Sequence, residues 1–251
     1  LVVLFQRRSK GWGVKMVDME LPDIDVIFAE FEHEYVEVHG CRMHYMEGGS
    51  GDTLVLVHGW SNNCLGWWPM VQDLKERYHL ILVDMPGFGK SDDLPRYDIE
   101  TEADYLAGFV EALEVQPLAM VGLSMGSQVL SYFGKQYPEL ARSLVLFGSV
   151  FHTNRRKRVT QRAMKLFLQG VGKGKRISRL FKRVIEDERF AILTSKYINM
   201  YKLNMELVKV NQEGRKEMRI ETFIQMGISE AVYKIEESLD GVAVPVLLGF
   251  G

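Results

Sequence analysis

The sequence predicts an α/β fold in which a mostly parallel sheet is flanked by helices and carries an inserted helical cap. Three observations lead to this prediction. Short and nearly continuous apolar runs recur along the chain, helical patterns separate them, and one long stretch holds helical patterns only. Continuous apolar runs are typical of strands that are buried on both faces of a parallel sheet. Strands that alternate with helices pair in parallel through right-handed crossovers.

Length and composition narrow the class of protein. The chain has 251 residues, which suits a core with an inserted subdomain. Hydrophobic residues make up 47% and charged residues 25%, which excludes a disordered or collagen-like chain. The formal net charge of −2 argues against a nucleic-acid partner. The only cysteines are Cys41 and Cys64, and no apolar run approaches about 18 residues, so we expect a cytoplasmic location.

Residues 1–32 are expected to form an N-terminal extension. The apolar stretch Leu1–Phe5 is followed by the basic stretch Gln6–Lys10, which is the reverse of the order in a signal peptide. One interpretation is non-native or over-extended sequence, with Met16 or Met19 as the natural start. The alternative is the end of a lost membrane anchor, because membrane helices end in basic residues on their cytoplasmic side. That alternative would make the protein membrane-associated.

The sheet is expected to occupy residues 33–150 and to resume at 239–251. A hairpin opens it, with strands Tyr35–Val38 and Arg42–Met46 around His39-Gly40. The further predicted strands are Thr53–Val57, Leu80–Val83, Leu118–Val121, Ser143–Phe147 and Val244–Leu248. Helical patterns cover Ile99–Leu113 and Gln128–Tyr137. The chain stops just after the last apolar run, so we expect the last strand and helices of the fold to be missing.

Residues 151–238 are expected to form the helical cap, since no strand pattern occurs before Val244. One amphipathic helix stands out, because its apolar residues follow the spacing i, i+3, i+4, i+7, i+8. These residues are Ile177, Leu180, Phe181, Val184 and Ile185. The segment Gly170–Lys175 does not fit a phosphate-binding loop and is predicted to join two cap helices.

A serine flanked by glycines lies between a predicted strand and a predicted helix. The segment Gly122-Leu123-Ser124-Met125-Gly126 has the G-x-S-x-G form, in which a sharp turn lifts the serine hydroxyl above the sheet. Gly122 and Gly126 keep the turn open, because a Cβ at either position would clash. The turn also places the Met125 backbone N–H at a helix N-terminus, where it can stabilise an oxyanion. We therefore predict Ser124 as a catalytic nucleophile.

Two further segments complete a resemblance to the α/β-hydrolase superfamily, in its lidded, serine-nucleophile branch. His58-Gly59-Trp60 is similar to the H-G-x loop of that family, which implies that the Trp60 backbone N–H is the other oxyanion donor and that His58 is structural. Asp84–Ser91 is similar to the D-x-x-G-x-G-x-S loop, which shapes the site wall. The resemblance covers about Tyr35 to Gly251. It implies an esterase, lipase or C–C hydrolase with no cofactor, and no cluster has metal-ligand spacing.

The catalytic base and acid are harder to place. The histidines of the chain are His33, His39, His44, His58, His79 and His152. The resemblance implies an acid after the strand Val244–Leu248 and a histidine later still. We therefore expect both to lie beyond Gly251 and this chain alone to show little or no turnover. His152 is the alternative base within the chain.

Aromatic residues near these loops predict an apolar substrate pocket. We expect Trp67, Phe88 and Phe151 to line it, which suits a small molecule with a carboxylic ester or thioester bond. One alternative is hydrolysis of a carbon–carbon bond in a diketone-like compound, and another is a non-catalytic binding module of the same fold. Serine at the turn argues against the branches that use aspartate there, the haloalkane dehalogenases and epoxide hydrolases.

The predicted cap is strongly basic. Between Arg155 and Arg189 there are thirteen Lys and Arg against three acidic residues. Four of these, Arg176, Arg179, Lys182 and Arg183, are expected to lie opposite the apolar face of their helix. They form either a solvated outer face or a surface attracted to an anionic membrane or an acidic substrate. The sequence leaves the oligomeric state open.

Overall fold

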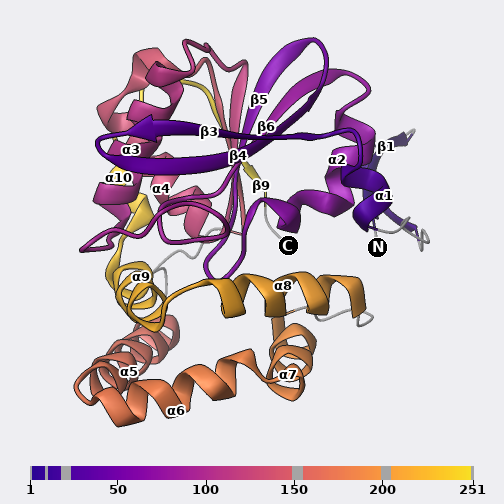
Figure 1. Cartoon of the computed structure of the whole chain (residues 1–251). Coiled ribbons are helices and arrows are strands. Elements are labelled where there is room, and N and C mark those ends of the chain that lie inside the picture. Colours follow the sequence, from indigo (N-terminus) through magenta and orange to yellow (C-terminus); the bar gives the residue numbers. More distant parts are fainter. Residues whose placement is uncertain (1, 9–10, 18–23, 149–154, 199–204, 250–251) are drawn as a thin grey trace.

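The computed structural model describes residues 2–8, 11–17, 24–148, 155–198 and 205–249, and side chains at 24–148, 159–193, 205 and 208–249 (Figure 1). The main sheet has the strand order β3-β4-β6-β5-β7-β8-β9. Its strands are β3 Glu32–Val38, β4 Cys41–Gly49, β5 Asp52–Val57, β6 Tyr78–Val83, β7 Ala119–Leu123, β8 Leu144–Phe147 and β9 Val246–Gly249. The hairpin β3–β4 is antiparallel and joins β6, and every pairing from β6 to β9 is parallel. The predicted fold class is confirmed.

Helices cover both faces of this sheet (Figure 1). The helices before the cap are α1 Ile24–Phe28, α2 Trp68–Leu74, α3 Ile99–Ala112 and α4 Met125–Gln136. Short 3-10 turns lie at Cys64–Trp67 and Pro138–Leu140. Asp98 precedes helix α3 as its N-cap, and its side chain accepts a hydrogen bond from the Thr101 N–H in the first turn.

The alternation of side chains along each central strand explains why the apolar runs are continuous. Val55 and Val57 of β5 pack with α3 and α4 in one hydrophobic cluster, whereas Leu54 and Leu56 pack with α1 and α2 in another. Because successive strand residues point to opposite faces, a strand between two helical layers needs apolar residues at every position. The sheet thus separates two cores.

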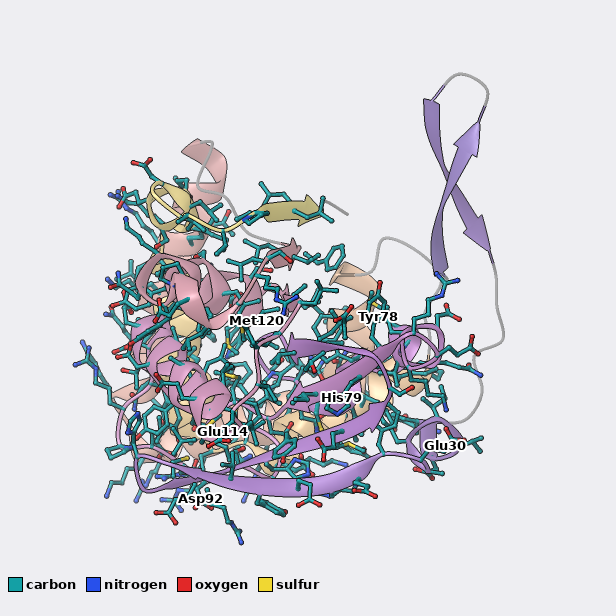
Figure 2. The ribbon with its side chains drawn as sticks, turned by 90° about the horizontal axis from the view of Figure 1, so that it is seen from above. Glu30, Tyr78, His79, Asp92, Glu114 and Met120 are labelled. Carbon is teal, nitrogen blue, oxygen red and sulfur yellow. The ribbon has the colours of Figure 1, made fainter. Side chains whose placement is uncertain are left out.

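An N-terminal hairpin lies apart from this sheet. Strands β1 Val2–Arg8 and β2 Gly11–Val17 pair only with each other and project away from the main body (Figure 2). Residues 2–8 are therefore extended, which differs from the helix end considered for the apolar stretch Leu1–Phe5. Among the described residues, no helix combines the length and the apolar character needed to cross a membrane.

The helices that follow β8 form a layer below the sheet in the view of Figure 1, except the last one, which lies beside α4. They are α5 Arg155–Gly172, α6 Lys175–Glu186, α7 Glu188–Ile198, α8 Met205–Glu217, α9 Ile220–Val232 and α10 Ile235–Leu239. Helix α5 packs on α9, α6 packs on α5 and α8, and α10 packs on α4 of the core. The term cap is used below for α5–α9. Of the predicted joint Gly170–Lys175, only Lys173 and Gly174 lie between the helices, because α5 extends to Gly172 and α6 begins at Lys175.

The orientation of α6 differs from the one that its sequence predicts. Ile185 is buried and Phe181 partly buried, but Ile177, Leu180 and Val184 are exposed. Lys182, predicted on the outer basic face, is instead turned inward against α8. The prediction fails because α6 is an edge helix with one inner side, and that side is narrower than its apolar face.

Candidate active site

Ser124 lies at a strained turn between β7 and α4. Its φ of 52° and ψ of −108° place a non-glycine residue in the left-handed half of conformational space. The Ser124 N–H donates to the Phe147 carbonyl oxygen at 2.8 Å, which holds the turn against β8. Strain of this kind persists only where the surroundings over-determine it, and it is concentrated at functional sites.

Glycines on both sides of the turn allow close approach. A Cβ at Gly122 would lie 2.6 Å from the Gly126 carbonyl carbon, and a Cβ at Gly126 would lie 2.2 Å from the Val57 carbonyl oxygen. Both distances are far below any ordinary contact. The two glycines therefore bring α4 against the ends of β5 and β7, with Met125 as the first residue of α4.

The loop after β5 lies directly beside this turn. A Cβ at Gly59 would be 3.6 Å from Ser124 Cβ and 3.2 Å from the Leu123 carbonyl oxygen, so the His58–Trp60 backbone borders Ser124. His58 is buried, its Nδ1 lies 2.9 Å from the Gly59 carbonyl oxygen, and its Nε2 accepts from the Met85 N–H. Burial lowers the pKa of His58. With both nitrogens occupied, His58 holds two loops together.

Asp84 organises the loop after β6. Its carboxylate accepts hydrogen bonds from His44 Nδ1 at 2.7 Å and from the backbone N–H groups of Cys64 and Lys90. Burial alone would raise the pKa of Asp84, but the His44 hydrogen bond and the nearby histidines hold it below the usual value. Gly89 is required here, because a Cβ would meet Asp84 Oδ2 at 2.1 Å.

His44, Cys64 and Asp84 are close enough to share a metal ion. The donor set does not suit one, however. Both Asp84 oxygens are already engaged within the fold, and burial raises the pKa of the Cys64 thiol well above its usual value. A thiol must lose its proton to bind a metal. These three residues are therefore explained as a hydrogen-bonded support for the loops around Ser124.

Glu230 of α9 brings a carboxyl group to Ser124. Ser124 Oγ donates to Glu230 Oε1 at 3.1 Å, across 106 positions of sequence. Burial raises the pKa of Glu230 to about 7, although the hydrogen bond from Ser124 acts in the opposite direction. The sequence analysis did not identify Glu230, because an isolated glutamate in a predicted cap helix carries no local signal of its partner.

Several contacts fix α9 on the core and so fix Glu230. The Ile99 N–H donates to Ser229 Oγ at 3.0 Å, and Gln128 Nε2 donates to the Glu230 carbonyl oxygen at 3.3 Å. At the other end of α9, Trp60 Nε1 donates to the Phe223 carbonyl oxygen, and the two rings lie 4.4 Å apart. The predicted oxyanion-loop residue Trp60 thus uses its side chain to hold the cap.

The predicted pocket residues have different positions. Trp67 and Phe88 are 3% and 1% exposed and belong to the two hydrophobic clusters, with Phe88 packed edge-on against His58. Their burial assigns them to the core rather than to an open pocket wall in this structure. Phe151, and the alternative base His152, lie outside the described residues.

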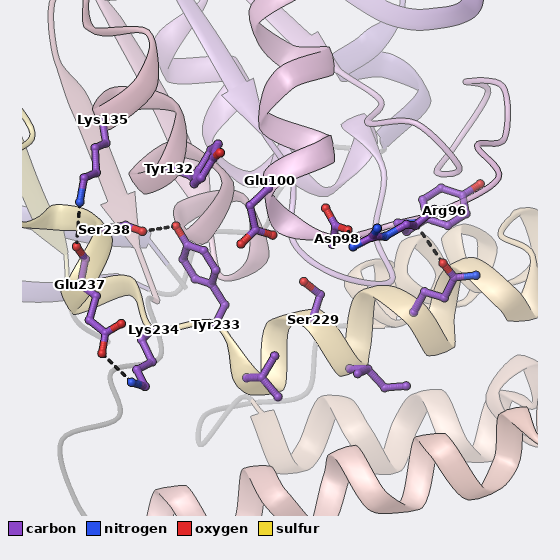
Figure 3. A pocket seen from close by; sticks show the side chains of 14 residues that line it. Arg96, Asp98, Glu100, Tyr132, Lys135, Ser229, Tyr233, Lys234, Glu237 and Ser238 are labelled. Carbon is purple, nitrogen blue, oxygen red and sulfur yellow. Dashed lines mark hydrogen bonds and ion pairs between the residues drawn. The ribbon is translucent and has the colours of Figure 1, made fainter.

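A hollow of about 800 Å³ lies on the other side of α9, between the cap and helices α3 and α4 (Figure 3). Most of its lining residues are of polar or charged type, among them Glu100, Tyr132, Lys135 and Tyr233. Tyr233 Oη and Ser131 Oγ, 3.2 Å apart, join α9 to α4 beside it. Ser124 is not among its lining residues. The hollow is therefore separate from the candidate nucleophile.

Comparison with known proteins shows which family and which relatives this chain resembles. The family model described as alpha/beta hydrolase fold matches residues 52–193. A 2-hydroxy-6-oxononadienedioate/2-hydroxy-6-oxononatrienedioate hydrolase of Paraburkholderia phymatum is 37% identical over 43% of this chain and 40% of its own length. A pimeloyl-[acyl-carrier protein] methyl ester esterase of Aeromonas hydrophila is 37% identical over 40% of this chain and 39% of its own length.

The solved structures agree on the fold. The crystal structure of E-2-(acetamidomethylene)succinate hydrolase matches 87% of this chain and 80% of its own, with a TM-score of 0.70 and 21% identity. At that identity the likeness concerns the fold alone. The chain spans less than half the length of the curated relatives that it matches.

Proposed function

Since the chain belongs to the alpha/beta hydrolase family, we propose that Ser124 is the nucleophile of a serine hydrolase that cleaves carboxylic ester or thioester bonds of a small, largely apolar molecule. The strained φ of Ser124 at the N-terminus of α4 carries this proposal. A serine there presents its hydroxyl at the sheet edge, next to backbone N–H groups of a helix N-terminus.

The proposed reaction has two steps. Ser124 Oγ attacks the substrate carbonyl carbon, the hydroxyl proton passes to a base, and the alcohol or thiol leaves with a proton, so an acyl-enzyme forms. Water then hydrolyses the acyl-enzyme and regenerates the hydroxyl. We propose that the backbone N–H groups of Met125 and Trp60 hold the oxyanion in both steps. The close approach of Gly59 to Ser124 supports this arrangement.

The proposed reaction also needs a base that accepts the proton of the Ser124 hydroxyl. Within the described residues, the hydrogen-bond partner of Ser124 Oγ is Glu230 and not a histidine. In a serine triad the base is an imidazole that an acid orients, and no such pair contacts Ser124 within the part of the chain that the structure describes. We therefore propose that the chain of 251 residues turns over simple esters slowly by itself.

A second candidate is hydrolysis of a carbon–carbon bond next to a ketone. The relative from Paraburkholderia phymatum is named for a hydrolase of oxo-dienedioates and favours this candidate, whereas the relative from Aeromonas hydrophila is named for an ester. The same serine and oxyanion donors would serve either bond. The substrate carbonyl differs, so the products of hydrolysis distinguish the two reactions.

Labelling with a fluorophosphonate probe tests the nucleophile directly. We expect covalent labelling of the wild-type chain at Ser124, identified by peptide mass, and none in Ser124→Ala. The matched control is Ser50→Ala, an exposed serine in the turn between β4 and β5, which should label like the wild type. Equal labelling of Ser124→Ala would refute the proposal, and a folded but unlabelled wild type would favour a non-catalytic binding module.

A further inference from the structure

The outer face of α6 carries two parallel rows of side chains. The first row is apolar and consists of Ile177, Leu180 and Val184, which are 55%, 63% and 44% exposed. We call it the aliphatic row. Its spacing i, i+3, i+7 keeps the three side chains on one side of the helix. Soluble monomeric proteins rarely expose three large aliphatic residues in a line on one helix face.

The second row is basic and has the same spacing. Arg176, Arg179 and Arg183 each precede one member of the aliphatic row by one residue, and all three are exposed. We call them the arginine row. Consecutive residues are about 100° apart on a helix of 3.6 residues per turn, so the two rows run side by side along α6. The exposed face of α6 is therefore itself amphipathic, apolar along one half and cationic along the other.

The remaining side of α6 explains why both rows stay outside. Ser178 Oγ donates to the Val171 carbonyl oxygen of α5, and Ile185 is buried. Lys182 Nζ donates to carbonyl oxygens at the end of α8, the Met218 oxygen among them at 2.6 Å. These contacts fix the rotation of α6 about its axis. Figure 1 shows α6 at the edge of the cap that is remote from the sheet.

The surface continues beyond α6 on both flanks. On the aliphatic side, the Phe167 ring of α5 is 53% exposed and packs edge-on against Phe181, with ring centroids 5.4 Å apart. On the arginine side, an open hollow of about 370 Å³ is lined by Arg179, Lys182, Arg183 and Arg219, with Ile220 and Glu221. The apolar area therefore extends from α6 onto α5, and the cationic area extends from α6 to Arg219.

We propose that this face of α6 docks on the surface of an anionic phospholipid bilayer, with the helix axis in the plane of the membrane. The aliphatic row would enter the boundary between headgroups and acyl chains, and the arginine row would meet the lipid phosphates. Interfacial helices combine these two features, and each basic residue near an anionic leaflet adds to binding. The positive charge beside the apolar row favours a lipid surface over a second copy of this equally basic face, which would repel it.

Vesicle flotation tests the proposal without any need for catalysis, so it is independent of the proposed hydrolase activity. The purified 251-residue chain is mixed with vesicles of phosphatidylcholine alone or of phosphatidylcholine with phosphatidylglycerol at 3:1, at low and high salt. We expect binding to the anionic vesicles, at least tenfold weaker binding to neutral ones, and a decrease with salt. Equal binding to both vesicles, or no binding, overturns the proposal.

Paired variants assign the binding to the two rows. Leu180→Ser with Val184→Ser should lower binding at least tenfold, whereas Val26→Ser, a comparably exposed residue of α1, should not. Arg176→Gln and Arg183→Gln should each lower binding to anionic vesicles about fivefold, which corresponds to about 1 kcal/mol. Arg142→Gln, at an exposed arginine two residues before β8 and outside the cap, is the matched control.

Sedimentation velocity tests the alternative that a second copy of this chain covers the exposed face of α6. If the chain forms a dimer that Leu180→Ser disrupts, and anionic vesicles do not bind, then α6 is a protein interface and the lipid proposal is wrong. A variant that binds less because it is misfolded is identified by its circular dichroism and melting temperature. We expect these to match the wild type, because the side chains changed are exposed.

Discussion

Ser124 Oγ donates a hydrogen bond to Glu230 Oε1 at 3.1 Å, and this contact joins the turn after β7 to cap helix α9. The carboxyl group has a pKa of about 7, raised by burial. A group with this pKa changes its charge within the range in which most hydrolases operate. Ser124 therefore lies next to a carboxyl group, that of Glu230, which is uncharged below about pH 7 and anionic above it.

We predict that Glu230 sets a pH dependence in the reactivity of Ser124. The anionic carboxylate accepts the hydroxyl proton better than the neutral acid, so the rate of fluorophosphonate labelling should rise as the pH passes about 7. Glu230→Gln keeps a hydrogen-bond acceptor but cannot take up a proton. Its labelling rate should be flat between pH 5.5 and pH 8.5 (a range of about three units around that pKa) and close to the low-pH rate of the wild type.

The control is Glu221→Gln, an exposed glutamate at the start of the same helix. It should keep the wild-type inflection, since its side chain lies in solvent. Identical pH profiles for the wild type and Glu230→Gln would show that the carboxyl group does not influence the serine.

Glu102 should make the protein less stable as the pH rises. It is fully buried in α3, and neither carboxyl oxygen has a hydrogen-bond partner among the described residues. Burial, and secondarily Asp98, raise its pKa well above 4.5. An acid with a raised pKa stabilises the fold fully below its unfolded pKa, and that contribution is lost as the pH rises through the folded pKa.

The variant Glu102→Gln removes this dependence. Urea unfolding should give similar stabilities for the two proteins near pH 5, with the variant gaining at most about 1.4 kcal/mol per pH unit above that. Glu111→Gln, exposed on the same helix, serves as the control and should follow the wild type. A difference between Glu102→Gln and wild type that stays constant with pH would contradict the assignment of Glu102 as a neutral buried acid.

Two glycine substitutions should have opposite effects on stability. A Cβ at Gly126 would meet the Val57 carbonyl oxygen, so Gly126→Ala should lower the free energy of unfolding by about 1–3 kcal/mol. Gly170 in α5 has no atom within 4 Å of the corresponding position. Gly170→Ala should therefore raise the free energy by about 0.5–1 kcal/mol, because alanine is the better helix former. Equal effects in denaturant melts would refute the claim that close approach, and not helix propensity, selects glycine at position 126.

Lys182 should hold α6 on α8. Its ammonium group donates to three backbone carbonyl oxygens at and just after the C-terminus of α8, those of Arg215, Lys216 and Met218. It also lies 2.8 Å from the Glu186 carboxylate. A cation at a helix C-terminus satisfies carbonyl groups that have no partner in the helix. We expect Lys182→Met to destabilise the protein by about 1–2 kcal/mol.

Lys175→Met is the matched change on the same helix, at an exposed lysine, and should leave the melting temperature within about one degree, since surface changes alter stability little. Limited proteolysis gives a second readout, because loss of the Lys182 contacts should increase cleavage between α6 and α8 but not in the core. Unchanged cleavage in Lys182→Met would mean that the hydrogen bonds contribute nothing to the position of α6.

Local sequence was sufficient for most of the sheet. The predicted run Thr53–Val57 corresponds to β5 Asp52–Val57, and Val244–Leu248 overlaps β9 Val246–Gly249. These predictions succeed because strands between two helical layers need continuous apolar residues, and that requirement is visible in a few consecutive positions. The predicted position of the serine turn after β7 depends on the same kind of local signal.

The rotation of the cap helices was not determined locally. The periodicity of Ile177–Ile185 correctly predicted a helix, but it placed Lys182 on the outer side. Tertiary packing decided otherwise, because α6 has one neighbouring layer and the end of α8 offers carbonyl oxygens that a lysine can bind. Part of the apolar face was left in solvent as a result.

By itself, the sequence determined most strands of the main sheet, several of the helices and the place of a serine turn between a strand and a helix, since these depend on residues within a few positions of one another. Only the tertiary structure decided that Glu230 accepts a hydrogen bond from Ser124 and that Trp67 and Phe88 are buried in the core. Contacts across about a hundred positions depend on how whole elements pack, and no short pattern in the chain encodes them.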